Sequence, residues 1–431
     1  MIRNEELKES IPFVDGLPNH WDILPNKYLF KYDGKKVGED FANYQLLSLT
    51  TSGIKEKDIN DKGGKVPDSY NNYQTVKKGQ MIFCLFDLDC SAVFSGRSSF
   101  DGMITSAYDV FSTTNLMNSK FADYWFKYVF SNRYYMLFSK NIRYTVSEDM
   151  FNSLKTPVPP MKEQQRIAGF LDKKCAQIDE LIKLQENEIE KLKEYRTSLI
   201  TEKVFGESYD ISKVKEVKDI CLKTIPSHWD FLKTSKVFNV ITDFVASGSF
   251  ADLAKNVEYL SEPGYALLVR TADLSGSRDN KVYISKESYD FLHNSNLFGG
   301  EIILPNIGSV GDVYLVPNMY EKMSLGPNAI MLKSKYLDKY YYYYFASKIG
   351  RVILNNLCEA TAQQKFNKTN FREMKICVPP IEEQFEIIDF LDKKCYVVDN
   401  LIEKKKDKIK KLQDYKKSLI YECVTGKRRL V

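Results

Sequence analysis

The sequence PPMKEQQ at Pro159–Gln165 returns as PPIEEQF at Pro379–Phe385, 220 residues later (379 − 159 = 220). The match continues without a gap, and 24 of the 48 positions from 159 to 206 are identical to their counterparts. Within it, FLDKKC occurs at both Phe170–Cys175 and Phe390–Cys395. Chance does not produce identity at this level, so the chain contains an internal duplication. A period this long is not a solenoid, whose units run about 20–50 residues.

A shorter match lies upstream of each copy. LPNHWD at Leu17–Asp22 matches IPSHWD at Ile225–Asp230, at an offset of 208 (225 − 17 = 208). The second copy therefore carries 12 more residues between its two matches (220 − 208 = 12). Most of residues 22–143 and 230–363 share no obvious identity. Each copy thus joins a constant part to a divergent part, which suggests a common scaffold or partner and two different ligands.

The constant segments are predicted to be long helices. Prolines followed by acidic residues are a common helix start, and each segment ends near a glycine. Apolar side chains then recur at alternating spacings of four and three, which is the heptad pattern of a coiled coil. The predicted core positions are Ile178, Ile182, Ile189, Leu192 and Leu199 in the first helix and Val398, Ile402, Ile409, Leu412 and Leu419 in the second.

The charges of the two helices favour pairing of the first with the second. Glutamates cluster at 186–194 in the first helix, whereas lysines cluster at 404–411 in the second. Because like charges repel and opposite charges attract, we expect an intramolecular, antiparallel pair with a pseudo-two-fold axis. The alternative is that the lysines simply form a solvated face, as exposed lysines usually do.

The divergent regions are predicted to be rich in β-strands. Apolar runs at 80–86, 301–305 and 313–316 are bounded by turn residues. Aromatic stretches at 121–130 and 340–345 are predicted to be helices. The consecutive tyrosines of the second stretch favour packing over base stacking, because consecutive residues point all around a helix.

The expected fold class is α+β, with two mixed α/β domains that have β-rich cores and are joined by the two long helices. Each divergent domain precedes its constant helix. The expected boundaries are 1–157 for the first divergent domain, 158–206 for the first helix, 207–377 for the second divergent domain and 378–431 for the second helix with its basic tail.

Each divergent region closes on a polar loop before its helix. Ser147 and Asn367 are predicted to be N-caps of short helices. Just upstream of these caps, the residues at matched positions differ between the two copies. In the major groove Arg pairs well with guanine and Gln with adenine. Different residues at matched positions would therefore suit two domains that read different DNA sequences. An ordinary surface loop is an equally good interpretation of any single residue. The candidate readers are Arg143 and Tyr144 in the first copy and Gln363 and Gln364 in the second.

The composition and the absence of known motifs exclude several classes of function. The 431 residues are 43% hydrophobic and 28% charged, with a net charge of +5, as in a folding chain. Without an apolar run of 18 residues or a secretory signal at the N-terminus, we expect a cytoplasmic protein. Three histidines and eight scattered cysteines argue against histidine catalysis and metal binding. P-loop, dinucleotide, serine-hydrolase and amino-methyltransferase motifs are absent. We therefore expect no catalytic residue, no metal site and no cofactor bound by this chain.

These signatures, in this order and with the main one twice, resemble the specificity subunit of type I restriction-modification systems. Supporting stretches are FDGMITSAY at Phe100–Tyr108 and IGSVG at Ile307–Gly311, and the resemblance covers nearly the whole chain. It implies two target recognition domains that each read one half of a split DNA site, with the paired helices as a ruler for the unread spacer. The second copy departs from the first where Phe385–Glu386 replaces Gln165–Arg166.

The resemblance also implies partners. They are double-stranded DNA, two methylation subunits and restriction/translocase subunits, with S-adenosylmethionine, ATP and Mg bound by those subunits. The competing hypothesis is a coiled-coil adaptor that presents two protein-binding domains and no DNA site.

A net charge of +5 is modest for a DNA-binding chain, so phosphates are expected to meet local lysines and arginines. The predicted DNA contacts are Lys77, Lys78, Arg97, Arg133, Lys140, Arg143 and Tyr144 in the first domain, and Arg270, Arg278, Lys281, Ser309, Gln363, Gln364, Lys365 and Lys368 in the second.

Overall fold

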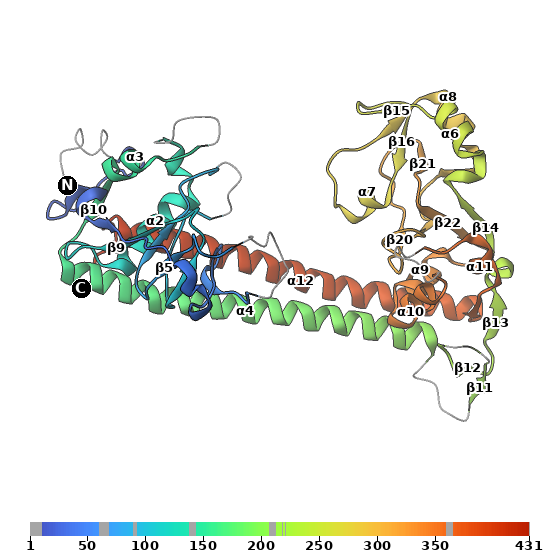
Figure 1. Ribbon diagram of the computed structural model, residues 1–431. Helices are drawn as coiled ribbons and strands as arrows, with labels where there is room; N and C mark the ends of the chain where they lie inside the picture. The colour runs from blue at the N-terminus through green and yellow to red at the C-terminus, as the bar shows by residue number, and fades with distance from the viewer. Residues whose placement is uncertain are drawn as a thin grey trace. The chain divides into compact units, whose positions relative to one another are not determined.

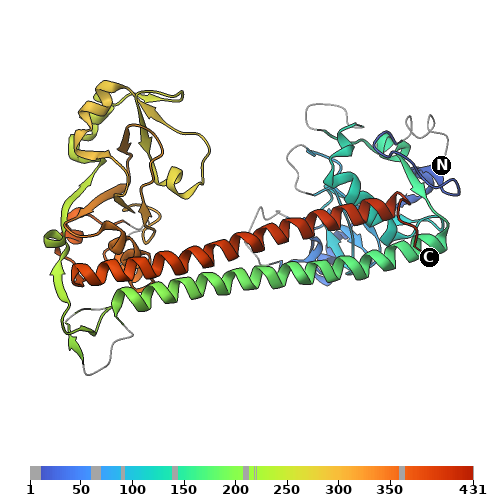
Figure 2. The ribbon, with the colours of Figure 1, turned by 180° about the vertical axis from the view of Figure 1, so that it is seen from behind.

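The computed structural model describes residues 11–59, 69–88, 93–137, 144–206, 213–217, 219, 221–358 and 365–430. It divides into two compact units, a first unit of residues 1–185 with 406–431 and a second unit of residues 186–405. The two long helices, α4 (Met161–Phe205) and α12 (Ile381–Val424), each contribute one part to each unit. Within each unit these parts lie side by side (Figures 1 and 2).

The predicted fold class is confirmed, because both units combine β-sheets with helices and both pack on the long helices. The division into four parts at residues 157, 206 and 377 stays a prediction. Among the described residues, no helix is both long enough and apolar enough to cross a membrane.

The first unit is built on a four-stranded sheet in the order β2-β9-β6-β7, with two smaller ladders, β3-β4 and β5-β8, beside it. Its elements are β1 (Asp22–Pro25), η1 (Asn26–Tyr28), β2 (Phe30–Tyr32), η2 (Gly38–Asn43), β3 (Leu47–Thr50), β4 (Gly53–Glu56), β5 (Gln74–Val76), β6 (Met81–Phe83), β7 (Ser95–Arg97), β8 (Gly102–Ile104), β9 (Asp109–Thr113), α2 (Ser119–Ser131), η3 (Tyr134–Leu137), α3 (Glu148–Ser153) and β10 (Lys155–Val158).

The second unit has a four-stranded sheet in the order β14-β22-β19-β20 and a separate five-stranded sheet, β15-β17-β16-β21-β18. Its elements are β11 (Val214–Glu216), β12 (Thr224–Pro226), β13 (Asp230–Lys233), α5 (Thr234–Val237), β14 (Phe238–Asp243), η5 (Phe244–Ser247), α6 (Phe250–Asn256), β15 (Tyr259–Leu260), β16 (Ala266–Val269), α7 (Thr271–Ser275), β17 (Tyr283–Ile284), α8 (Lys286–Phe291), η6 (His293–Ser295), β18 (Asn296–Leu297), β19 (Ile302–Pro305), β20 (Tyr314–Leu315), β21 (Met323–Leu325), β22 (Ala329–Ser334), α9 (Asp338–Ala346), α10 (Lys348–Asn356), α11 (Lys368–Glu373) and β23 (Lys375–Val378).

The two repeated signatures of each copy meet at the start of its long helix. In the first unit His20 contacts Glu163 at 2.8 Å, and in the second His228 contacts Glu383 at 2.9 Å. The strands that follow the histidines pair with the strands that precede the helices, β1 with β10 and β13 with β23. The upstream match therefore persists because it packs on the downstream match.

A buried glutamine closes each helix start. The Nε2 atoms of Gln164 and Gln384 donate to the carbonyl oxygens of Pro159 and Pro379 at 2.8 and 2.9 Å, and both glutamines are fully buried. A buried amide costs free energy unless it is hydrogen-bonded. In each copy the amide nitrogen of the glutamine thus satisfies the carbonyl of the first proline, which explains why the proline pair and the glutamine recur together.

The heptad stripe is the less exposed face of both helices. Ile178, Ile189, Val398 and Ile402 are each at most 7% exposed. Lys405 and Arg196 are polar residues within the stripe, and the register of their ion pairs shows antiparallel pairing. In the second unit Glu188 meets Lys405, while the later residue Arg196 meets the earlier residue Asp399. The expected attraction between the glutamate and lysine clusters is therefore present at Glu188.

The ion pair of Arg196 has an equivalent in the first unit, at the corresponding position of the repeat. Arg196 Nε lies 3.1 Å from Asp399 Oδ1, and Lys416 Nζ lies 2.6 Å from Asp179 Oδ1. The two cations are 220 residues apart in the sequence, and so are the two carboxylates (416 − 196 and 399 − 179). A cation inside an apolar stripe costs free energy in any register of the two helices that leaves its charge unpaired. These ion pairs therefore favour one alignment of the helices.

The aromatic helices form the cores beneath the sheets. The predicted helix at 121–130 is α2 and the one at 340–345 is α9, so both predictions are confirmed. Tyr340, Tyr341 and Tyr344 are fully buried. The tyrosine run is therefore a packed helix, as expected, and does not stack on bases. Ser147 and Asn367 cap α3 and α11 through side chains that accept from Met150 N and Asn370 N.

Two adjacent tyrosines in this core predict opposite mutational effects. Tyr340 Oη donates to Val204 O at 2.9 Å, whereas Tyr341 Oη is buried and has no hydrogen-bond partner within the part of the chain that the structure describes. Tyr340→Phe is expected to cost about 1–2 kcal/mol of unfolding free energy because it strands a buried carbonyl, and Tyr341→Phe to be neutral or stabilising. Chemical denaturation of both variants measures the difference, and equal losses would contradict this assignment.

Candidate nucleic-acid interface

The central strands β6 and β19 are equivalent, and each begins at a tight turn. In the first unit the side chain of Gln80 accepts from Lys77 N at 2.7 Å. In the second, Glu301 accepts from Phe298 N at 3.1 Å and Gly299 N at 2.9 Å. Both capping side chains are buried. The scaffold of this turn is shared, while its surface residues differ, and we call it the turn end of each domain.

The opposite end of these strands meets the loop before the long helix. Val146 N donates to Leu85 O at 2.8 Å in the first unit, and Phe366 N donates to Asn306 O at 3.1 Å in the second. A bridge between Ile307 and Lys365 extends the second contact. Each domain therefore presents two adjoining loops on a fixed base, which we call the loop end.

The predicted contacts of the first domain divide between the two ends. Lys77, Lys78 and Arg97 lie at the turn end, where Arg97 Nε donates to Ser119 Oγ at the start of α2. Arg133 follows the end of α2. A helix of 13 residues spans about 20 Å, so these residues do not form one continuous patch.

The remaining first-domain candidates lie at the loop end or outside the described residues. Tyr144 is half-buried at the loop end with a positive φ of 47°. Arg133 is exposed and also has a positive φ, of 54°. Lys140 and Arg143 lie outside the described residues.

The second domain brings some of its candidates together and neutralises others. Ser309 and Lys365 are both exposed at the loop end, and Arg278 and Lys281 are exposed beyond α7. By contrast, Arg270 donates to both carboxylate oxygens of Asp273, which raises the pKa of its guanidinium. The candidates Gln363 and Gln364 lie outside the described residues.

Lys368 is also held by an acidic partner. Its Nζ lies 2.8 Å from Asp243 Oδ1, and that carboxylate is mostly shielded from solvent. This ion pair must break before the ammonium group of Lys368 can bind a phosphate. Lys368 and Arg270 are therefore better explained as structural residues than as DNA contacts, although both stay predictions.

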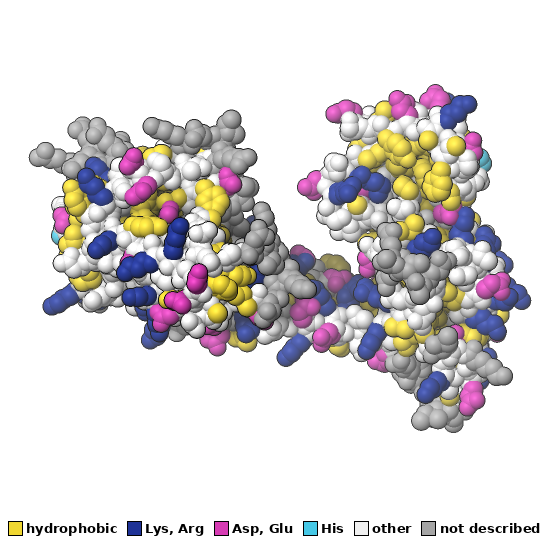
Figure 3. All heavy atoms as spheres, viewed as in Figure 1, with side chains coloured by type: hydrophobic (Ala, Val, Ile, Leu, Met, Phe, Trp, Pro, Cys, Tyr) yellow, Lys and Arg dark blue, Asp and Glu magenta, His cyan; other side chains and the backbone are white. Residues whose placement is uncertain are grey.

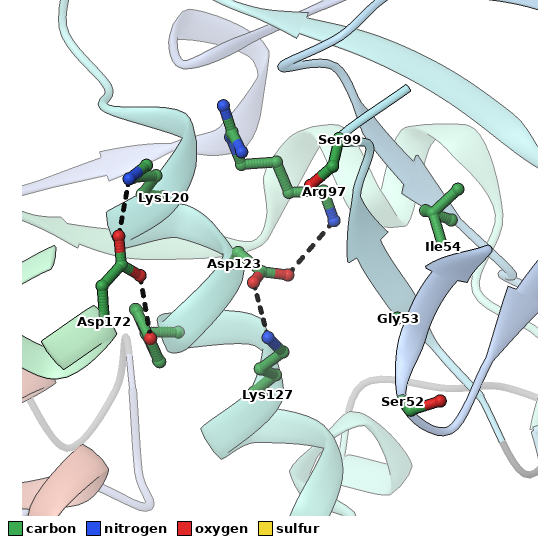
Figure 4. Close-up of a pocket in the computed structure, with 10 residues that line it drawn as sticks. Ser52, Gly53, Ile54, Arg97, Ser99, Lys120, Asp123, Lys127 and Asp172 are labelled. Atoms are coloured by element: carbon green, nitrogen blue, oxygen red, sulfur yellow. Dashed lines mark hydrogen bonds and ion pairs between the residues drawn. The ribbon is translucent and has the colours of Figure 1, made fainter. Parts of the chain in front are cut away.

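A cavity of about 310 Å³ in the first unit gathers charged side chains between α2 and α4 (Figure 4). Lys120 Nζ and Tyr124 Oη contact the two oxygens of Asp172 at 2.6 and 3.0 Å. Asp123 binds Lys127 at 2.7 Å and accepts from the backbone of Arg97. Each carboxylate in the cavity is thus paired with a lysine.

The second unit repeats the central part of this arrangement. Lys339 Nζ and Tyr343 Oη contact the two oxygens of Asp392 at 2.6 and 2.7 Å. Asp392 is the counterpart of Asp172 in the repeated FLDKKC motif. The repeated aspartate therefore anchors each domain to its long helix, and the cavity is explained by anchoring.

The described residues offer no metal cluster, and their most perturbed thiols are unreactive. No group of three or more His, Cys, Asp or Glu side chains stands close enough to hold a metal within the described part of the chain. The seven described cysteines are free thiols. Burial raises the pKa of Cys377 and Cys423 to about 12, which suppresses the nucleophilic thiolate.

Sequence reasoning missed the helix α10. It carries Arg351 and Asn355 on its exposed face, beside the loop end of the second domain. The signal available in the sequence was Ser347, a residue type that favours N-caps, followed by an amphipathic stretch.

On the visible face of each unit in Figure 3, lysines and arginines are interspersed with acidic side chains, so charge alone does not outline an interface.

Three comparisons place this geometry among known proteins. The family model described as "Type I restriction modification DNA specificity domain" matches residues 213–411. A putative type I restriction enzyme MjaX specificity subunit from Methanocaldococcus jannaschii is 24% identical over 291 residues, covering 66% of this chain and 62% of the relative. The type I restriction enzyme MjaVIII specificity subunit of the same organism is 24% identical over 296 residues, covering 66% and 64%.

The chain thus spans just under two thirds of the length of these curated relatives. A solved chain from work on complex assembly and conformational transition of the type I R-M system has a TM-score of 0.70 at 12% identity, covering 96% of this chain and 99% of that one. That likeness concerns the fold. The matched domain and the two relatives make this chain similar to the specificity subunits of type I restriction-modification systems.

Proposed function

We propose that this chain reads a bipartite DNA target, one half-site for each divergent domain, and holds the catalytic subunits of a type I restriction-modification complex. The observation that carries the proposal is the repetition of one scaffold beneath two different sets of loops. The anchors of Asp172 and Asp392 are equivalent, as are the loop-end contacts of Val146 and Phe366. Two readers of different sequences require a common frame and unlike surfaces.

In this proposal the chain itself is non-catalytic. Methyl transfer and DNA cleavage, with S-adenosylmethionine, ATP and Mg, belong to two methylation subunits and to restriction/translocase subunits. The absence of nucleotide and methyltransferase motifs from the sequence supports this division. The long helices, which would set the length of the unread spacer, would also offer binding surface to the partner subunits.

Methylome sequencing of cells with and without the gene tests the proposal. A split methylated motif should be present with the gene and disappear without it. A methylome that does not depend on the gene would instead favour the coiled-coil adaptor without a DNA site.

A repeated pair of exposed apolar side chains supports binding of two copies of one partner. Leu181 and Tyr415 in the first unit are 45% and 51% exposed, and their counterparts Leu401 and Tyr195 in the second are 42% and 54% exposed. Leu181 and Leu401 directly precede the stripe positions Ile182 and Ile402. Tyr195 and Tyr415 directly precede Arg196 and Lys416, which continue the stripe at its spacing of four and three. In each unit the exposed pair therefore lies on one flank of the two helix parts. Large apolar residues exposed at matched positions are typical of protein interfaces.

We expect the double variant Tyr195→Lys, Leu401→Lys to weaken one of two methylation-subunit sites by roughly tenfold or more, because interface aromatics often dominate binding. Native mass spectrometry should then find one methylation subunit per chain where the unmodified chain binds two. Tyr396→Lys is the matched control, since Tyr396 is 70% exposed but its counterpart, Ala176, is not a large apolar residue. Unchanged stoichiometry in the double variant would count against this surface.

A further inference from the structure

The helix α10 is held rigidly in the second unit by its inner face and its first turn. Ser347 Oγ accepts from Gly350 N at 2.9 Å, and Lys348 N donates to Thr201 Oγ1 of α4 at 3.0 Å. Ile353 and Leu354 are 6% and 1% exposed. The helix therefore presents its outer face in a fixed orientation, as a recognition element must.

The outer face of α10 carries two polar side chains, neither of which makes a hydrogen bond within the described residues. Arg351 and Asn355 are both exposed and stand four residues apart, so they lie on the same side of the helix. In the described part of the chain, no hydrogen bond or ion pair holds the guanidinium of Arg351. This contrasts with Arg270, whose guanidinium is engaged by Asp273.

This face adjoins the loop end. A Cβ atom on Gly311 would lie 3.4 Å from Asn355 Oδ1, so the loop and the helix are in contact. Burial raises the pKa of Tyr314, and the nearby charge of Arg351 acts against that rise. The bridge from Ile307 to Lys365 joins the loop to the segment before α11. Helix, loop and segment thus form one surface.

The first copy builds a different structure at the same place. After the shared lysine, tyrosine and aspartate anchor, α2 continues as one helix to Ser131 and is followed by the short helix η3. In the second copy α9 ends at Ala346 and α10 begins a new helix. The two copies therefore diverge directly after a common anchor, where readers of different half-sites are required to differ.

We propose that α10 is a base-reading helix of the second domain, an inference that rests on the proposed function. The DNA major groove is about 12 Å wide and admits an α-helix, and nine residues span about 14 Å. Arg pairs bidentately with guanine and Asn with adenine. Arg351 and Asn355 would each read one base of the second half-site, while the exposed Lys348 and Lys365 would meet phosphates.

Substitutions in the assembled methyltransferase complex test this assignment. Arg351→Ala and Asn355→Ala should each relax one base pair of the second half-site, with a loss of discrimination of about 5- to 100-fold, and leave the first half-site unchanged. Arg351→Lys should relax the same base pair because it keeps the charge but loses the bidentate geometry. Binding to duplexes with a randomised second half-site, together with methylome sequencing, gives the readout.

Lys348→Ala is the matched control on the same helix. It should weaken binding about equally for every sequence and reduce the salt dependence, because a phosphate contact carries no sequence information. An unchanged motif in the Arg351 and Asn355 variants would overturn the inference. So would failure of these variants to bind the methylation subunits, which would make α10 a protein contact. A complex in which no half-site depends on this chain would instead overturn the proposed function itself.

Discussion

Gly350→Ala is expected to destabilise the second unit by about 3 kcal/mol, although it adds only one methyl group to a helix. A Cβ atom at this position would lie 2.0 Å from Tyr344 O and 2.8 Å from Phe345 Cα. Both atoms belong to the backbone of α9, so neither can rotate away. Overpacking of this kind typically costs about 1–3 kcal/mol and occasionally more, and here the helix must move from its site.

Gly169→Ala is the matched control, since Gly169 also lies inside a helix. It is exposed on α4, and nothing lies within 4 Å of its Cβ position. Alanine is favoured over glycine in a helix interior, so this variant should gain about 0.5–1 kcal/mol. Denaturation midpoints of the two variants should therefore shift in opposite directions. A shift in the same direction would show that α9 and α10 do not approach as described.

The two glycines also show where sequence reasoning stops. Each interrupts a helical stretch, and propensity assigns both the same cost. Only the crossing of α9 and α10 distinguishes them, and that crossing depends on how the tyrosines of α9 pack. Such information is tertiary and leaves no local pattern.

The long helices and their stripe could be predicted because heptad periodicity is local and sustained. The caps at Ser147 and Asn367 could be predicted for the same reason. The repeat added a second kind of information. It singled out Gln164 and Asp172, and the structure gives each of them a packing role that the sequence alone did not suggest.

The candidate interface was harder to predict. Lys368 has its acidic partner 125 residues away, at Asp243, so the sequence could not show that its charge is already used. Asp273 lies only three residues from Arg270, and that pair could have been recognised. The strands β15, β17 and β18 of the second unit are only two residues long, too short for an alternating pattern to reveal them. The surface that they support was therefore not foreseeable.

Deleting one heptad from each long helix is expected to abolish methylation at the natural site and to create a site with a shorter spacer. The proposed deletion removes residues 184–190 from α4 and 404–410 from α12. These segments are equivalent in the repeat (404 − 184 = 220), and the ion pairs Glu188–Lys405 and Arg196–Asp399 place them opposite each other. Glu188 and Lys405 leave together, so no unpaired charge remains from that contact.

The remaining helices keep their register after this deletion. The stripe continues from Ile182 to Leu192 and from Ile402 to Leu412 at a spacing of three, and the pair between Lys416 and Asp179 is retained. Seven residues correspond to about 10 Å, which is about three base pairs at 3.4 Å each. Both half-site sequences should be unchanged, because neither divergent domain is altered.

Affinity at the new spacing should be lower than for the natural site. Three base pairs rotate one half-site by about 100° around the duplex, since a helical turn takes 10–10.5 base pairs, whereas a heptad leaves an α-helix only about 20° out of phase. Deleting 404–410 alone is the control, and it should abolish methylation at every spacing because α4 then has no matching partner. Methylome sequencing distinguishes these outcomes. Altered half-site bases, or an unchanged spacer in the doubly shortened chain, would show that the helices do not measure the distance between half-sites.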